Sequence, residues 1–135
     1  MYSNPELDRT GRALLEQLHG GEAGEQLVNG LKDICPDFAT MTLEWALAGI
    51  MARPGLDLIT REFLLIASCV TLGHVVPQLR AHIASARKLG ATREQIVEVI
   101  LQMTFYAGGA ATSNALAVAK EVLAGEVARA VASGS

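Results

Sequence analysis

The amino-acid sequence predicts an all-α protein with a single helical domain. Half of its 135 residues are hydrophobic but only 4% are aromatic, so the core must be built from Ala, Leu, Ile and Val. Such small side chains allow helices to approach one another closely. Apolar residues recur at helical spacing, and no segment convincingly reads as a strand. We expect about six helices in a domain over residues 1–130, followed by a flexible tail over 131–135.

Glycine and proline separate the helices expected in the first part of the chain. A helix is predicted over residues 5–18, where it meets the segment HGGEAGE. A short helix over 25–31 follows, and a longer one runs over 36–51 with a proline at its start. The segment Arg-Pro-Gly at 53–55 ends that helix. Trp45, inside the longer helix, is interpreted as a packing residue.

The apolar run FLLIASCVTL at residues 63–72 predicts the central helix. Because it places apolar side chains on nearly every face, we expect this helix to be buried all round and to end at Gly73. The next helix is expected over 77–89, since proline is favoured in a first turn. A capping box T-x-x-Q at 92–95 starts another helix. After a Gly-Gly pair, the last helix is predicted over 111–123.

Composition and charge exclude several classes of function. The net charge is −3 and basic residues form no cluster, which argues against a nucleic-acid partner. No apolar run is long enough for a membrane span, and the N-terminus lacks the features of a signal peptide, so we expect a cytoplasmic protein. Two cysteines, Cys35 and Cys69, lie far apart without a C-x-x-C motif, and we interpret both as buried small side chains.

The segment GHVVPQLRAHI at residues 73–83 contains the most informative polar side chains. His74, Gln78 and His82 are four residues apart and would share one face of an uninterrupted helix. Pro77, however, is expected to start a new helix and to leave His74 in the preceding loop. Glutamine is also a poor ligand for transition metals, so we predict no metal site.

His82 is the best candidate for acid–base chemistry, because its side chain exchanges protons near neutral pH. Gln78, one turn earlier, would orient His82 or a bound carbonyl group. The alternative is a core histidine that is hydrogen-bonded to a backbone carbonyl. Arg61 and Glu62 either lie at a solvated helix end or turn inward, to bind a carboxylate and to relay a proton.

Two further side chains toward the C-terminal end of the sequence are interpreted from their residue type. Tyr106 is interpreted as a packing residue. Asn114 lies on an otherwise Ala-rich face, where a buried amide would need hydrogen-bond partners.

Three segments together resemble the carboxymuconolactone decarboxylase family of the alkylhydroperoxidase D-like superfamily. They are ARPGLDLITREFLLIA at 52–67, the link TLGHVV, and the long segment that starts with PQLRAHIASARKLG at 77. Within that long segment, ATREQIVEVILQ, YAGG and NALAVAKEVL follow one another in the order typical of the family. The resemblance covers residues 45–123, and more loosely the N-terminal segment LDRTGRALLEQL.

The resemblance implies an all-helical homotrimer or homohexamer with active sites beside the buried helix. One branch of the superfamily reduces peroxides through a C-x-x-C motif, whose cysteines would fall here at Val75 and Gln78. Since both cysteines are absent, we expect no thiol peroxidase activity. The other branch decarboxylates carboxymuconolactone without a cofactor, and its histidine matches His82.

The sequence also departs from the family pattern. The resemblance leads one to expect an acidic residue where Gly49 stands and an aromatic residue where Met51 stands. The position of Gln78, often acidic in the decarboxylases, is neutral here as well. These changes imply a less charged and roomier pocket, suited to a larger or less acidic substrate.

The leading hypothesis is a cofactor-independent decarboxylase or isomerase that acts on a lactone, β-keto acid or similar carbonyl compound. His82, Gln78 and Glu62 would be the catalytic residues, and substrate-binding residues would be Arg53, Arg61 and His74. The alternative is a non-catalytic protein of the same fold that binds a small metabolite or serves in assembly. A peroxidase that uses Cys69 is disfavoured, because an apolar run disfavours a thiolate.

Overall fold

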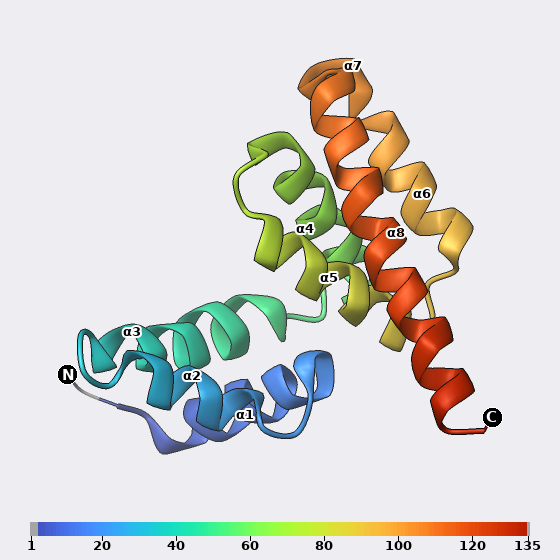
Figure 1. Cartoon of the computed structure of the whole chain (residues 1–135). Helices are drawn as coiled ribbons and strands as arrows, with labels where there is room; N and C mark the ends of the chain where they lie inside the picture. The colour runs from blue at the N-terminus through green and yellow to red at the C-terminus, as the bar shows by residue number, and fades with distance from the viewer. Residues whose placement is uncertain (1–2, 135) are drawn as a thin grey trace. The chain divides into compact units, whose positions relative to one another are not determined.

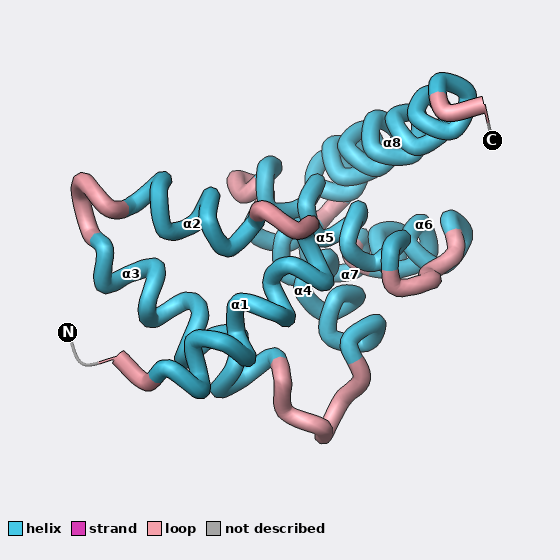
Figure 2. Tube along the Cα trace, turned by 90° about the horizontal axis from the view of Figure 1, so that it is seen from below, coloured by secondary structure: helices cyan, strands magenta, loops and turns pink. Residues whose placement is uncertain are grey.

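The computed structural model describes residues 3–134, and every regular element in that range is a helix (Figure 1, Figure 2). The expected all-α fold is therefore confirmed. The chain divides into two compact units, of which the first ends at Asp57 and the second begins at Leu58. The first unit contains α1 (Pro5–His19), α2 (Ala23–Leu31), α3 (Pro36–Met41) and the π-helix η1 (Thr42–Met51). The second contains α4 (Leu58–Leu72), α5 (Val76–Lys88), α6 (Arg93–Gln102), α7 (Thr104–Ala107) and α8 (Gly109–Ala132).

Helix α1 begins at a side-chain cap and packs closely against η1. The Asn4 side-chain oxygen accepts hydrogen bonds from the backbone N–H groups of Glu6 and Leu7, at 3.0 and 3.3 Å. Such a cap satisfies N–H groups that have no partner within the helix. At Gly11 the two elements touch, because a Cβ atom there would lie 1.8 Å from the carbonyl oxygen of Leu43. Only glycine permits this approach, so Gly11 sets the packing of α1 on η1.

The segment 36–51 is not the single α-helix that its apolar spacing predicts. Helix α3 ends at Met41, and the chain continues as the π-helix η1. The backbone N–H of Ala52 donates to the carbonyl oxygen of Leu47 at 2.9 Å, five residues back rather than four. The wider turn rotates the following side chains away from α-helical spacing. The packing role predicted for Trp45 is wrong, since 68% of this residue is exposed.

Helix α4 is buried on one face only, whereas the apolar run predicted burial all round. Its buried residues include Glu62, Ile66 and Cys69, whereas Leu64 and Leu72 are 55% and 59% exposed. Helices α5, α6, α7 and α8 all contact α4 within this unit. One charged residue therefore lies on the buried face, and two leucines lie on the exposed one.

The starts of α5 and α6 confirm the expected helix signals. Pro77 lies in the first turn of α5, and Gly73, just after α4, has the positive φ of +79° that favours glycine. At the start of α6 the Thr92 hydroxyl accepts from the Gln95 N–H at 3.0 Å. The Gln95 side chain accepts from the Thr92 N–H at 2.9 Å, which completes the predicted capping box.

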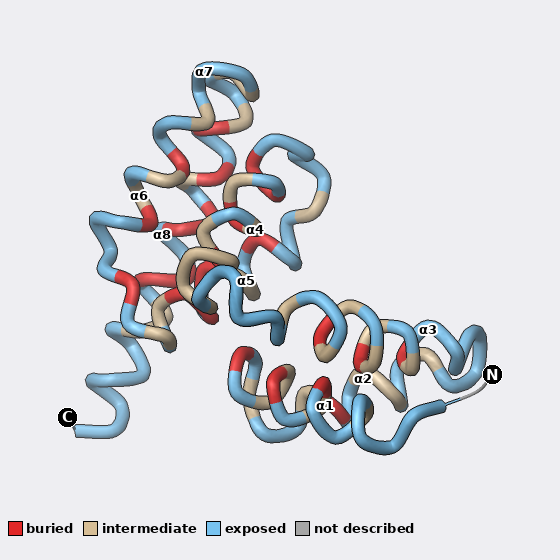
Figure 3. The backbone as a smooth tube through the Cα atoms, turned by 180° about the vertical axis from the view of Figure 1, so that it is seen from behind, coloured by how far each residue is buried: buried red, intermediate tan, exposed pale blue. Residues whose placement is uncertain are grey.

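Helix α8 is longer at both ends than the predicted range 111–123, and the short helix α7 precedes it. Glycine at an interior helix position costs only about 1 kcal/mol, so Gly125 does not end α8. Two ion pairs join α5 to α8, with nitrogen-to-oxygen distances of 2.7 Å for Arg80–Glu121 and 3.1 Å for Arg87–Glu126. The buried residues of this unit, red in Figure 3, lie on helix faces that are turned toward the other helices of the unit.

Several residues expected inside the protein lie on its surface instead. Tyr106, interpreted as a packing residue, is 98% exposed, and its neighbour Phe105 is 87% exposed. Cys35, interpreted as buried, is also exposed.

Among residues 3–134, none of the helices combines the length and apolar character that a membrane span requires. The homotrimer or homohexamer stays a prediction.

Candidate active site

The hairpin of α4 and α5 brings together two of the predicted site residues. Gly73 and the two residues after it form the short connection between these helices. The Nδ1 atom of His82 on α5 lies 2.7 Å from the Oε2 atom of Glu62 on α4. The two residues are 20 positions apart in sequence, so only the packing of the helices creates this contact.

The Glu62–His82 pair is held in a protected environment. Glu62 is fully buried, whereas 20% of the His82 side chain remains exposed. With Glu62 ionised, the Nδ1–H group of His82 donates to Oε2, and this hydrogen bond fixes the orientation and the tautomer of the imidazole. Proton exchange with a ligand then falls to Nε2. This geometry favours acid–base chemistry over the alternative of a core histidine bonded only to a backbone carbonyl.

The second carboxylate oxygen of Glu62 is the most informative polar atom of the site. Within residues 3–134, Oε1 of Glu62 is buried and has no hydrogen-bond partner. A buried acceptor is energetically costly unless a donor satisfies it, so Oε1 is suited to accept a hydrogen bond from outside the protein. A water molecule or a hydroxyl group of a ligand would supply that donor. The solvated helix end considered for Glu62 is therefore wrong.

Cys69 follows Glu62 two helical turns later on the buried face of α4. Burial raises the pKa of the Cys69 thiol above its ordinary value, and the negative charge of Glu62 raises it further. The thiol therefore remains protonated near neutral pH, which removes the nucleophilic thiolate that a peroxidase needs.

The two cysteines are expected to differ sharply in their reaction with a thiol reagent. In the native protein at pH 8, Cys35 should be modified rapidly because it is exposed, and Cys69 slowly because it is buried with a raised thiol pKa. Counting modified thiols by mass spectrometry should give one fast site natively and two after unfolding in urea. A Cys35→Ser variant serves as the control, and rapid labelling of Cys69 in that variant would contradict the assignment.

The other predicted site residues occupy different environments. Gln78 is exposed on α5, and His74 is exposed in the preceding loop with Nδ1 3.1 Å from the Leu72 carbonyl oxygen. Arg61 is partly buried and immediately precedes Glu62. Arg53 is exposed and belongs to the other unit. The substrate-binding roles of the two arginines, like the orienting role of Gln78, stay predictions.

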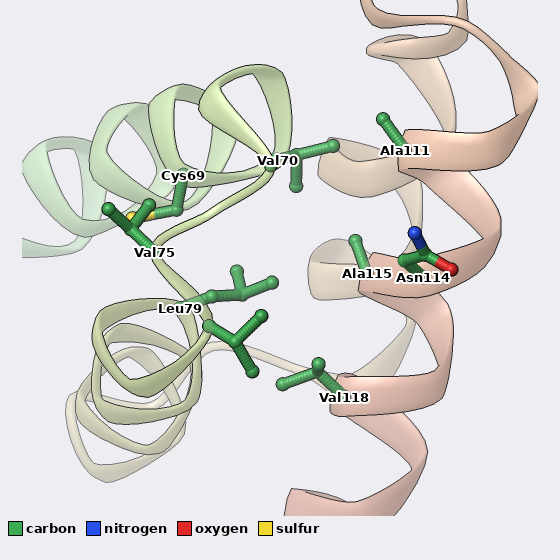
Figure 4. A pocket seen from close by; sticks show the side chains of 10 residues that line it. Cys69, Val70, Val75, Leu79, Ala111, Asn114, Ala115 and Val118 are labelled. Carbon is green, nitrogen blue, oxygen red and sulfur yellow. The ribbon is translucent and has the colours of Figure 1, made fainter.

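A small pocket lies between α4, α5 and α8 (Figure 4). Its cavity volume is about 30 Å³. Asn114 lines it but is exposed, so the expected buried amide is wrong. Sequence reasoning missed this pocket, because its lining comes from three helices: Cys69, Val70, Gly73, Val75, Val76, Leu79, Ala111, Asn114, Ala115 and Val118. In the sequence, the small residues Ala111 and Ala115 were the signal that could have indicated a pocket here.

Within residues 3–134, no group of three or more His, Cys, Asp or Glu side chains is placed to hold a metal ion.

The fold and the site together define an all-helical protein in which a buried carboxylate is paired with a partly exposed histidine. Residues 36–121 match the model of the carboxymuconolactone decarboxylase family. The chain is 34% identical over 103 residues to a 4-carboxymuconolactone decarboxylase of Acinetobacter baylyi, a match that covers 73% of this chain and 76% of that protein. It is 33% identical over 100 residues to an uncharacterized 15.0 kDa protein from the nqo9–nqo10 intergenic region of Paracoccus denitrificans, covering 73% and 75%. The chain belongs to the carboxymuconolactone decarboxylase family.

Proposed function

We propose that this protein is a cofactor-independent decarboxylase or isomerase that acts on a lactone, β-keto acid or similar carbonyl compound. The observation that carries the proposal is the 2.7 Å contact between His82 and the buried Glu62. Supporting it are the family membership and the similarity to a 4-carboxymuconolactone decarboxylase. An imidazole oriented by a carboxylate is suited to give and take a proton at a substrate atom.

The reaction would proceed in two steps at the carbonyl group of the substrate. First, the bond between the carboxylate carbon and its neighbouring carbon (a ring carbon in a lactone) breaks, CO₂ leaves, and the electron pair passes into an enolate with its charge on the carbonyl oxygen. A hydrogen-bond donor at that oxygen lowers the barrier, and Gln78 offers an amide for this role. Second, the protonated His82 gives its Nε2 proton to the ring carbon, and a proton from water restores the imidazolium. Glu62 stabilises the imidazolium throughout.

The residue at position 78 argues for a substrate that is less acidic than carboxymuconolactone itself. Gln78 is neutral where the family resemblance often places an acid. With this carboxylate absent, the site would suit a less acidic substrate. Arg61, which immediately precedes Glu62, would hold the carboxylate that leaves as CO₂.

A screen for CO₂ release tests the proposed function. Purified protein is incubated with 4-carboxymuconolactone and with a panel of carboxylated lactones and β-keto acids, and CO₂ and products are quantified by mass spectrometry. We expect at least one compound to lose CO₂ well above the rate in buffer, with a less acidic compound preferred to 4-carboxymuconolactone. Thermal stabilisation by these compounds without CO₂ release and without an isomerised product would contradict the proposal and favour a binding protein of the same fold.

A further inference from the structure

The side chains that line the pocket between α4, α5 and α8 determine which chemical group can occupy it. Figure 4 shows Leu79 extending from α5 toward α8, on which Ala111, Ala115 and Val118 lie. No lysine, arginine or histidine is among its lining residues, and the one side-chain amide belongs to Asn114 at the exposed side of α8. A carboxylate would lose its hydration here without gaining a cation, whereas an aliphatic group would be favoured.

The spacing of residues along α5 places the pocket beside the catalytic pair. Val75 and Leu79 line the pocket, and His82 follows three residues after Leu79. Residues three apart share a helix face, so Leu79 and His82 lie on one face of α5, and Val75 immediately precedes this helix. Three residues correspond to about 4.5 Å of helix rise, which sets the order of the separation between Leu79 and His82 along the helix.

The same relation holds on α4, where Glu62 and Cys69 are seven residues apart on the buried face. Glu62 pairs with His82, and Cys69 lines the pocket. Burial raises the pKa of the Cys69 thiol, and repulsion by the negative charge of Glu62 raises it further. The pocket and the pair therefore lie along the same seam between α4 and α5.

We propose that this pocket is the subsite for a short aliphatic branch of the substrate whose carbonyl group reaches His82. The inference rests on the proposed function and names its substrate class: a carbonyl compound with a branch of one or two carbons in place of a second carboxylate. The volume of about 30 Å³ is about twice the roughly 10–15 Å³ that one water molecule needs on the same measure, so the branch must be short.

Binding of three lactones with the same ring tests the subsite without any need for turnover. The probes are γ-butyrolactone, γ-valerolactone and γ-caprolactone, which carry no branch, a methyl branch and an ethyl branch. Affinity is measured from methyl resonances of Val75, Leu79 and Val118 and from the imidazole resonance of His82. We expect the dissociation constant to fall about fourfold per added carbon, as the transfer of one methylene predicts. All four resonances should follow one binding curve.

A variant that fills the pocket and a matched control sharpen the test. Ala111→Leu enlarges a lining residue and should remove the preference for branched lactones, leaving equal affinities for all three. Ala117→Leu adds the same side chain to an exposed position of α8 and should keep the fourfold steps. Thermal unfolding confirms that both variants fold, and Ala111→Val replaces the larger variant if Ala111→Leu does not.

Two results would overturn the subsite. Equal affinity of the wild type for all three lactones, or no binding, would show that the pocket is a packing defect only. Shifts at the pocket without a shift at His82 would show that the pocket is not connected to the catalytic pair. Branch-dependent binding that reaches His82, combined with no CO₂ release from the screened acids, would leave the subsite standing and refute the decarboxylase.

Discussion

Replacing His82 by alanine is expected to reduce CO₂ release by about 10²–10⁴-fold, the contribution typical of a positioned acid–base group. The loss follows from the removal of the only side chain that is paired with the buried Glu62 and still partly exposed among the described residues. The measurement is the initial rate of CO₂ release at saturating substrate. The dissociation constant of a branched lactone should change much less than the rate, because the pocket side chains remain.

His19 supplies the matched control for that variant. It lies at the end of α1, in the other unit, and is exposed. His19→Ala should therefore keep the wild-type rate. Equal rates in the wild type and in His82→Ala would contradict the role of His82, whatever the substrate proves to be.

Replacing Glu62 by glutamine is expected to lower the rate of CO₂ release by about 100-fold while the protein stays folded. The glutamine oxygen can still accept the Nδ1–H of His82, so the shape of the site is kept. The negative charge that stabilises the imidazolium is lost. The effect of Glu62→Gln is measured as the initial rate of CO₂ release, and thermal unfolding checks that the variant is folded.

A double-mutant cycle separates a positioning role for Glu62 from a merely structural one. If Glu62 acts through His82, the combined variant Glu62→Gln/His82→Ala should be no slower than His82→Ala alone. Glu121→Gln is the matched control, since Glu121 is exposed and pairs with Arg80 rather than with the site. Multiplicative losses in the double variant would show that Glu62 does not act through His82.

Local signals in the sequence predicted several helix boundaries correctly. The capping box at Thr92 and Gln95 acts through hydrogen bonds to near neighbours, whereas the proline at 77 and the glycine at 73 act through their own backbone conformation, so a short stretch of sequence is sufficient. The π-helix could not be predicted in this way. Apolar spacing does not decide whether a backbone N–H pairs four or five residues back, as at Ala52.

The sequence named candidate site residues but did not predict how they contact one another. His82 and Glu62 were both candidates from residue type, yet their contact depends on how α4 packs on α5. An acidic residue near a helix start is usually favoured at a solvated end, which is why the burial of Glu62 could not be inferred. The pocket was missed for the same reason, since three helices contribute its lining.

The central claim is that the Glu62–His82 pair performs decarboxylation in this chain. Its most direct test is to follow CO₂ release and substrate consumption together, with the wild type, His82→Ala and buffer alone in parallel. We predict one CO₂ released per substrate consumed by the wild type, and release by His82→Ala reduced to near the buffer rate. Substrate that binds and stays intact in the presence of the wild type, or equal CO₂ release by both proteins, would contradict the account.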